Sequence, residues 1–183
     1  MVAPLFTTWD NPTPLVGYAG GCLRQVEDYK RKFLVVIDDT EDCNRAVAFA
    51  AYRVRRTGGA IVFLAVIDTA DFQQWLGVED VMRAEAMEEA ERLIDTRIAR
   101  VKKISDDIRV ETVIREGRAA EAVEHLIAED KDIAILVLAG SSSNDGPGEL
   151  VTALAMRGGA NALHIPVTII PGTMTDAEIE AAS

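Results

Sequence analysis

The feature that most constrains this sequence is a regular alternation between continuous apolar runs and segments with helical spacing. The first run, Phe33–Ile37, holds no polar residue and ends at Asp38–Asp39. An uninterrupted run of this kind is typical of a strand buried on both faces, as in a parallel sheet covered by helices. Cys43–Arg56 follows with its apolar residues on one helical face and stops at Gly58–Gly59, a frequent C-terminal signal of helices. The pattern therefore predicts a strand followed by a helix.

The same alternation continues along the chain. Further strands are predicted at Ala60–Ile67, Ile108–Ile114, Ile133–Ala139 and Val167–Ile170, and further helices at Val81–Ile104, Ala119–Glu129 and Glu149–Leu163. The strand at 108–114 alternates apolar and polar residues, which predicts a half-exposed position near a sheet edge. Five strands alternating with helices predict an α/β fold, a five-stranded parallel sheet with helices on both faces of the Rossmann-like kind. In such sheets ligands bind beyond the carboxyl ends of the strands, where the strand order reverses.

The length of 183 residues favours one domain with a full-sized core. Residues 1–32 hold three of the six prolines and no sustained period, so we expect an N-terminal arm that is partly ordered. Residues 33–172 form the domain. Residues 173–183 are an acidic C-terminal tail, in which Thr175 and Glu178 have the spacing of a capping box for a short helix.

Charge and composition exclude several classes of protein. The net charge is −11, from 30 acidic and 19 basic residues, whereas a nucleic-acid partner requires a basic face. The two cysteines, Cys22 and Cys43, make neither a disulfide scaffold nor a zinc site. No apolar run approaches the roughly 18–20 residues of a membrane span. A signal peptide begins with basic residues, and here none precedes Arg24. We therefore expect a cytoplasmic protein without nucleic-acid or membrane partners.

Asp38–Asp39 is the first candidate site, because it follows a buried strand. Adjacent carboxylates at a strand end hold Mg²⁺ in phospho-receiver domains. Such domains also need a lysine after the last strand, and Val167–Gly172 contains none. The alternative is structural: Asp39, Thr40 or Asp42 accepts the free N–H groups of the helix that follows.

The second candidate is the loop Gly140–Gly148, which is rich in glycine and serine and joins a predicted strand to a predicted helix. Backbone N–H groups in such a loop can hold phosphate. The loop has no Gly-Lys-Ser/Thr sequence, and the chain has no G-x-S-x-G nucleophile elbow, which disfavours a serine hydrolase. A polar loop without a ligand is the alternative.

Several segments together resemble the universal stress protein family over about residues 32–172. In chain order these segments are Phe33–Ala46, Ile61–Asp68, Val113–Val123, Leu136–Ser141 and Ile165–Ile170. The resemblance implies an adenine-nucleotide site in which Asp38 contacts the adenosine and the backbone of Val66 meets the adenine. It implies a phosphate loop that starts at Gly140 and includes Ser141, Ser142 and Ser143. No catalytic residue and no metal ligand is implied.

The sequence departs from the family pattern within this phosphate loop. Counted from Gly140, the second and third glycine positions hold Ser143 and Ala153, and the hydroxyl position holds Leu154. Losing one hydrogen bond to a charged group costs roughly 1.5–3 kcal/mol, against about 8 kcal/mol for micromolar binding. ATP is therefore a possible ligand whose binding we expect to be weakened or absent. Gly146 and Gly148 leave open a substitute loop.

We expect a homodimeric stress-response or signalling module that is not an enzyme, with an unidentified protein partner also possible. The alternative is an ATP-binding protein with slow ATPase or switch behaviour. The dimer is expected through the last strand, whose residues Val167, Thr168, Ile169 and Ile170 carry no charge. Unprotected edges of this kind pair with other strands, and two-fold pairing closes the assembly. The competing expectation is that the arm or the tail covers this edge within one chain.

Overall fold

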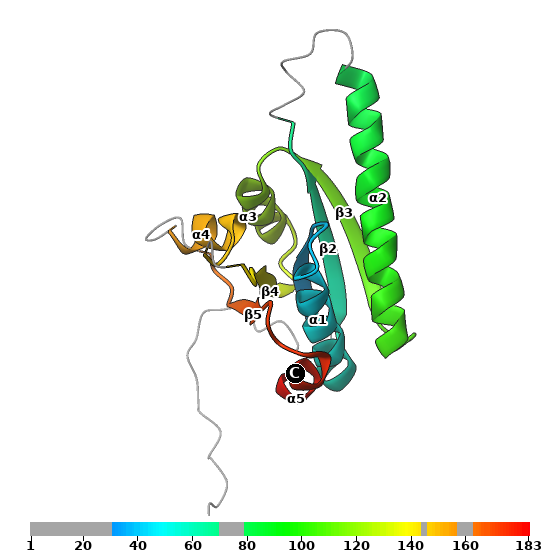
Figure 1. The fold of residues 1–183 in the computed structure, drawn as a ribbon, viewed down its shortest axis with the longest axis vertical. Helices are drawn as coiled ribbons and strands as arrows, with labels where there is room; N and C mark the ends of the chain where they lie inside the picture. Colours follow the sequence, from blue (N-terminus) through cyan, green and yellow to red (C-terminus); the bar gives the residue numbers. More distant parts are fainter. Residues whose placement is uncertain (1–30, 70–78, 144–145, 157–162) are drawn as a thin grey trace, which may run out of the picture.

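The computed structural model describes residues 31–69, 79–143, 146–156 and 163–183. The strands are β1 (Lys32–Ile37), β2 (Ala60–Ile67), β3 (Arg109–Glu116), β4 (Ile133–Gly140) and β5 (Val167–Pro171). The helices are α1 (Cys43–Thr57), α2 (Glu79–Ile104), α3 (Ala119–Glu129), α4 (Glu149–Ala155) and α5 (Asp176–Ala182). All strands are parallel, in the order β3-β2-β1-β4-β5 (Figure 1). The predicted α/β fold is confirmed.

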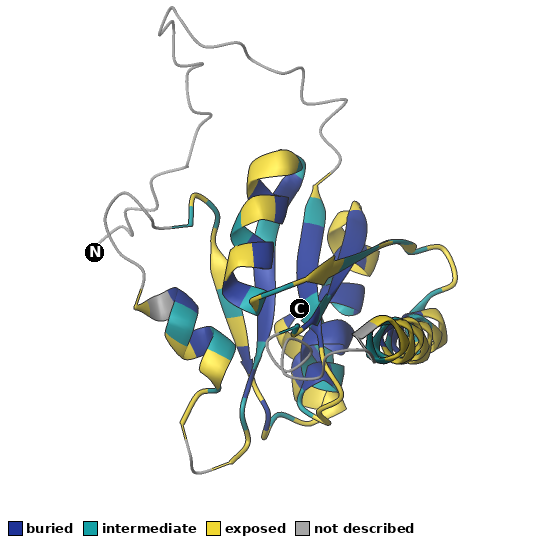
Figure 2. Ribbon diagram, turned by 90° about the horizontal axis from the view of Figure 1, so that it is seen from above, coloured by how far each residue is buried: buried dark blue, intermediate teal, exposed yellow. Residues whose placement is uncertain are grey.

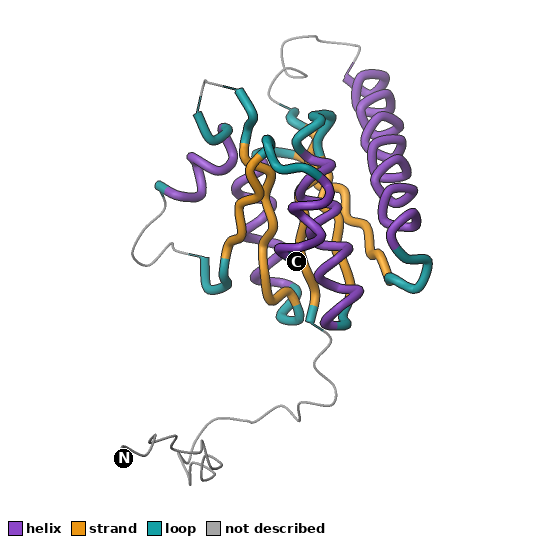
Figure 3. Tube along the Cα trace, turned by 60° about the horizontal axis from the view of Figure 1, so that its bottom comes forward, coloured by secondary structure: helices purple, strands orange, loops and turns teal. Residues whose placement is uncertain are grey.

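Two hydrophobic clusters lie on opposite faces of the sheet, because successive side chains of a strand point to opposite faces. Phe33, Val35 and Ile37 pack on the side of α1 and α2. Leu34 packs on the other side, with residues of α3 and α4. Figure 3 shows the strands as a layer between helices, and Figure 2 shows buried residues facing this layer. The continuous apolar runs of the sequence therefore reflect strands covered on both faces.

β1 begins one residue before the apolar run, at Lys32. The backbone of Lys32 pairs with Ala60 in β2 and with Ile133 in β4. Its Nζ lies 2.7 Å from carboxylate oxygens of Glu111 and Asp130. A lysine can occupy this half-buried position because two carboxylates neutralise its charge. Hydrophobicity alone does not reveal this position.

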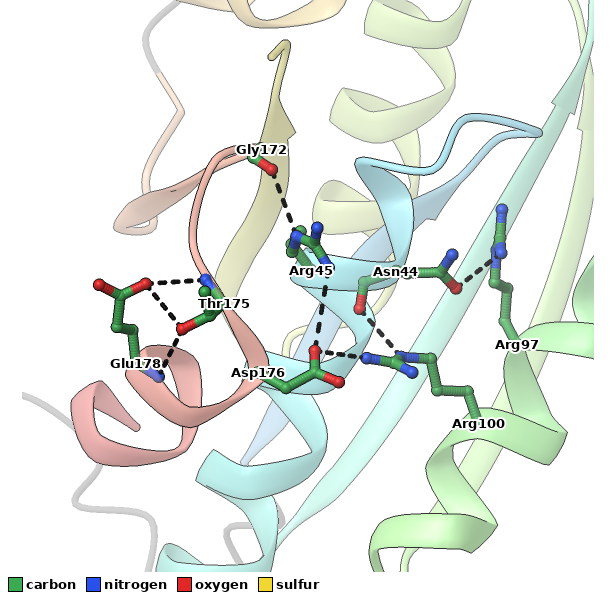
Figure 4. Close-up of polar contacts among 8 residues, drawn as sticks. All are labelled: Asn44, Arg45, Arg97, Arg100, Gly172, Thr175, Asp176 and Glu178. Atoms are coloured by element: carbon green, nitrogen blue, oxygen red, sulfur yellow. Dashed lines mark hydrogen bonds and ion pairs between the residues drawn. The ribbon is translucent and has the colours of Figure 1, made fainter.

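The acidic C-terminal residues fold onto the domain as helix α5. The capping box predicted at Thr175 and Glu178 is present: the Thr175 hydroxyl accepts from the Glu178 N–H, and the Glu178 carboxylate accepts from the Thr175 N–H at 2.8 Å (Figure 4). Ile179 is fully buried in the cluster that contains α1. Arg55 of α1 forms an ion pair with Glu180 at 2.8 Å. The expected polar tail is thus a docked helix, held by one apolar anchor and by ion pairs.

Several sequence-based expectations fall outside the described residues. These are residues 1–30 of the expected arm, residues 144–145 of the loop Gly140–Gly148, and residues 157–162 of the helix predicted at 149–163. Among the described helices, none is both long and apolar enough to cross a membrane.

Candidate functional site

The candidate site lies where the strand order changes direction. β1 and β4 are neighbours in the sheet although they are far apart in the chain. Each strand is followed by a helix, α1 on one face and α4 on the other. The two connections therefore leave the sheet in opposite directions and open a crevice between them. The segments that follow β1 and β4 contain both candidate motifs of the sequence.

A cavity of about 500 Å³ occupies this crevice on the α3 and α4 side of the sheet. Its lining includes Val36 of β1, Val66 of β2 and Leu138 of β4. The first residues of α3 and α4, among them Ala119 and Leu150, complete it. Its volume is within the usual range for small-molecule sites, about 300–1,000 Å³.

The structure brings three of the six predicted site residues together. Asp38, Val66 and Ser141 line the cavity, although they come from three different strand ends. Ser143 lies in an adjoining hollow. Neither Gly140 nor Ser142 is part of the cavity lining. The first two strand ends and the start of the loop therefore meet as the topology requires.

Gly140 is part of the sheet, because it is the last residue of β4 and pairs with Pro171 of β5. A Cβ added there would lie 3.2 Å from Cγ2 of Ile169. Close strand packing therefore explains this glycine.

The turn after β1 is organised by Asp38 and Thr40. The Oδ1 atom of Asp38 accepts from the Thr40 N–H at 2.9 Å and from its hydroxyl at 2.5 Å. The Thr40 hydroxyl oxygen in turn accepts from the N–H of Cys43, the first residue of α1, at 3.2 Å. Of the capping candidates Asp39, Thr40 and Asp42, Thr40 is thus the residue that caps the helix with its side chain.

Arg97 of α2 fixes the same turn from the other face of the sheet. Its guanidinium donates to the backbone carbonyl oxygens of Asp38 at 2.8 Å and Thr40 at 3.0 Å, and to Oδ1 of Asn44 at 2.8 Å. Only 6% of Arg97 is exposed, so these bonds are largely shielded from water. The sequence analysis missed Arg97, because it is one of many charged residues on α2 and its partners are more than 50 positions away.

Asp42 connects α1 with the loop after β4. Its Oδ2 accepts from the N–H of Ser142 at 2.9 Å and from the Ser142 hydroxyl at 3.1 Å. A Cβ at Gly172 would overlap Oδ1 of Asp42, so this carboxylate packs directly against the backbone that follows β5. Arg45 donates from Nε to the carbonyl of Gly172 at 3.2 Å (Figure 4). The predicted site residue Ser142 is therefore held by Asp42 and belongs to the scaffold of the loop.

The loop after β4 is closed by its own hydrogen bonds. The Ser141 N–H donates to the Pro147 carbonyl at 3.3 Å, and the Ser141 hydroxyl oxygen accepts from the Ser143 N–H at 3.1 Å. Gly146 and Gly148 have φ angles of 111° and 101°, a region that favours glycine. A hollow of about 480 Å³ adjoins the cavity here and includes Thr152. Gly146 and Gly148 line this hollow.

Two of the three positions that depart from the family pattern, Ala153 and Leu154, differ in their surroundings. Ala153 lines both the cavity and the hollow. Leu154 is 7% exposed and packs in the cluster formed with α3. An apolar side chain at residue 154 thus stabilises the core and offers no hydroxyl group to a ligand.

The cavity is acidic. Carboxylates of Asp38, Asp42, Asp68 and Glu149 belong to its lining, with Arg118 as its one guanidinium. The Arg118 side chain is 82% exposed and lies 3.5 Å from Glu121. Among the described residues, no cationic side chain pairs with Asp38, Asp42 or Glu149. The lining therefore carries more carboxylates than cations.

Neither a metal centre nor an activated thiol is found in the described part of the chain. No group of three or more His, Cys, Asp or Glu residues there has the geometry to hold a metal ion. Burial raises the pKa of the Cys43 thiol, which keeps it protonated and unreactive.

The sequence model of the universal stress protein family matches residues 30–171. This chain belongs to the universal stress protein family. UspA from Lactobacillus plantarum has the same fold, with a TM-score of 0.63 and 18% identity over 77% of this chain and 97% of that protein. No curated protein sequence matches this chain.

Solved structures with the same fold include nucleotide complexes. The universal stress protein from Archaeoglobus fulgidus in complex with dAMP has a TM-score of 0.58 and 15% identity, covering 78% of this chain and 98% of that one. An Arabidopsis thaliana family member with AMP bound has a TM-score of 0.51 and 16% identity, covering 77% and 91%. At these low sequence identities, the similarity shows a shared fold and nothing more.

Proposed function

We propose that this universal stress protein is a cytoplasmic, homodimeric stress-response or signalling module without enzymatic activity, in which ATP binding is weakened or lost. The observation that carries the proposal is the acidic cavity at the β1–β4 switch point. A triphosphate needs N–H donors and cations, and the described lining offers one guanidinium, on the largely exposed Arg118, against four carboxylates.

The substitutions in the loop support the same conclusion. The Cβ of Ala153 lies in the cavity wall, and Leu154 is committed to the core. The Ser141 and Ser143 hydroxyls lie 2.8 Å apart and so bond each other. A phosphate group entering the hollow would have to break that bond and would meet the carboxylate of Glu149. Each of these features lowers the affinity for phosphate.

The dimer is supported by the contrast between the two edges of the sheet. β3, at one edge, carries charged residues at both ends, Arg109 and Glu116. β5, at the other, exposes Val167 and Ile169 at 41% and 46%. Charged side chains protect an edge, whereas an apolar edge pairs with another strand. The acidic C-terminal residues, one alternative cover for β5, instead form α5 and contact α1.

An ATP-binding protein with slow ATPase or switch behaviour is the second candidate. It is favoured by the convergence of Asp38, Val66 and Ser141 on one cavity and by the nucleotides in structures of the same fold. The two candidates differ in what the purified protein contains. Extraction of freshly purified protein followed by chromatography is expected to yield no stoichiometric adenine nucleotide, and prolonged incubation with ATP and Mg²⁺ no release of phosphate. Stoichiometric ATP or ADP, or protein-dependent hydrolysis, would favour the second candidate.

A further inference from the structure

We propose that the cavity selects an uncharged nucleoside over its phosphate esters, so that each added phosphate weakens binding. This inference rests on the proposed function, because it takes the cavity as a ligand site that has lost its affinity for triphosphate. It names the class of ligand that the remaining groups can hold.

The apolar part of the cavity suits a flat, weakly polar body. Val36, Val66 and Leu138 contribute side chains from three adjacent strands. Leu150 and Val151 of α4 line it as well. A volume of about 500 Å³ accommodates a group the size of a nucleoside. Apolar walls of this kind favour a heteroaromatic ring over a highly hydrated group.

The polar part of the cavity consists mainly of hydrogen-bond acceptors. Asp38 uses Oδ1 for Thr40, and Asp42 uses Oδ2 for Ser142. The second oxygen of the Asp38 carboxylate accepts no hydrogen bond within the described residues, whereas Oδ1 of Asp42 packs against Gly172. A carboxylate accepts hydroxyl groups well, as in the binding of ribose by dinucleotide-binding folds. Sugar hydroxyls, which donate, are therefore complementary to this lining, and phosphate oxygens, which only accept, are not.

Glu149 further disfavours phosphate relative to sugar hydroxyls, at the place where a phosphate would lie. It is exposed and belongs to the lining of both the cavity and the adjoining hollow. It also stands in the first turn of α4, where its charge is favourably placed with respect to the free N–H groups. A phosphate approaching this turn therefore meets the negative charge of the Glu149 carboxylate. The repulsion acts on AMP and more strongly on ATP, but not on adenosine.

Calorimetric titration of the full chain with adenosine and with AMP tests this selectivity. We expect adenosine to bind on the order of tenfold more tightly than AMP. The reason is that the repulsion between like charges a few ångströms apart in a partly solvated site corresponds to about a tenfold change in affinity. Raising the salt concentration from about 0.05 M to about 0.5 M shortens the screening length severalfold. It should strengthen AMP binding and leave adenosine binding unchanged, the reverse of a cationic phosphate site.

Two matched variants locate the effect. Glu149→Gln should narrow the difference between adenosine and AMP severalfold, because it removes one carboxylate from the lining. Asp107→Asn removes the same charge from an exposed turn before the edge strand β3, outside the cavity lining, and should leave the difference unchanged. AMP binding as tightly as adenosine, binding of neither, or equal effects of the two variants would overturn the inference while leaving the proposed function intact. Micromolar binding of Mg²⁺–ATP would instead contradict the proposed function itself.

Discussion

Asp42 and Gly172 show how single residues position the candidate site. The carboxylate of Asp42 holds Ser142 of the loop and packs against Gly172, where a Cβ would overlap its Oδ1 and lie 2.8 Å from the Gly140 carbonyl oxygen. Three segments far apart in the chain therefore meet at one carboxylate. This arrangement depends on contacts between residues 100 positions apart, which no local sequence pattern encodes.

Gly172→Ala is expected to destabilise the protein by about 1–3 kcal/mol, because a methyl group would displace Asp42 and the end of β4. Urea unfolding followed by circular dichroism measures this change. Gly117→Ala is the matched comparison: Gly117 has a φ of 114°, but a methyl group added there would meet only open space. The Gly117→Ala variant should lose about 1–2 kcal/mol of unfolding free energy, from backbone strain alone. A Gly172→Ala variant as stable as the wild type would contradict the close packing of Asp42 against Gly172.

The secondary structure elements divide clearly between those that sequence predicts and those that need tertiary contacts. β2 and α3 have the predicted bounds, Ala60–Ile67 and Ala119–Glu129, because their apolar residues follow the periods of a buried strand and an amphipathic helix. The docking of α5 was not predicted. Its one buried residue, Ile179, stands in an acidic stretch that reads as a solvated tail. The capping box predicted where the helix begins but not that it packs against α1.

The uncharged β5 edge gives the prediction at this scale. Ile169→Lys should convert a dimer into a monomer in light scattering, because two lysines facing each other across paired edges repel and lose their hydration. Thr112→Lys adds the same charge to β3, where Thr112 is also exposed, and should leave the dimer intact. A wild-type protein that scatters as a 19.9 kDa monomer at micromolar concentration would be inconsistent with pairing through β5.

The whole fold depends partly on an ion-pair cluster at the start of the sheet. Burial acts to raise the pKa of Asp130, but the hydrogen bond from Lys32, a backbone N–H from Asp132 and the charge of Lys32 outweigh it. The pKa therefore lies below its ordinary value of 3.8. A lowered native pKa stabilises the folded state above the unfolded pKa, and this stability is lost as the pH falls through the native value.

Asp130→Asn is therefore expected to lower the free energy of unfolding at pH 7 and to reduce its loss on acidification below about pH 4. Urea titrations at a series of pH values measure both effects. Asp106→Asn, which removes an exposed carboxylate, serves as the control. Parallel pH dependence in Asp130→Asn and in the wild type would contradict a stabilising role for the Lys32 cluster.

At the scale of the whole molecule, the sequence placed three candidate residues at one cavity but did not predict the charged groups around it. Asp38, Val66 and Ser141 were predicted from strand ends and from the family resemblance, and they line one cavity. Asp42 and Glu149 join them only through the packing of α1 and α4, and Arg97 acts on the site from the other face of the sheet. These contributions follow from the tertiary arrangement.

The central claim, that this family member has lost tight ATP binding, is tested most directly by calorimetric titration of the wild-type protein with Mg²⁺–ATP. The acidic lining and the substitutions at Ser143, Ala153 and Leu154 predict no saturable heat signal in the micromolar range, since micromolar binding requires about 8 kcal/mol. A clear signal with one ATP per chain and micromolar affinity would contradict the account.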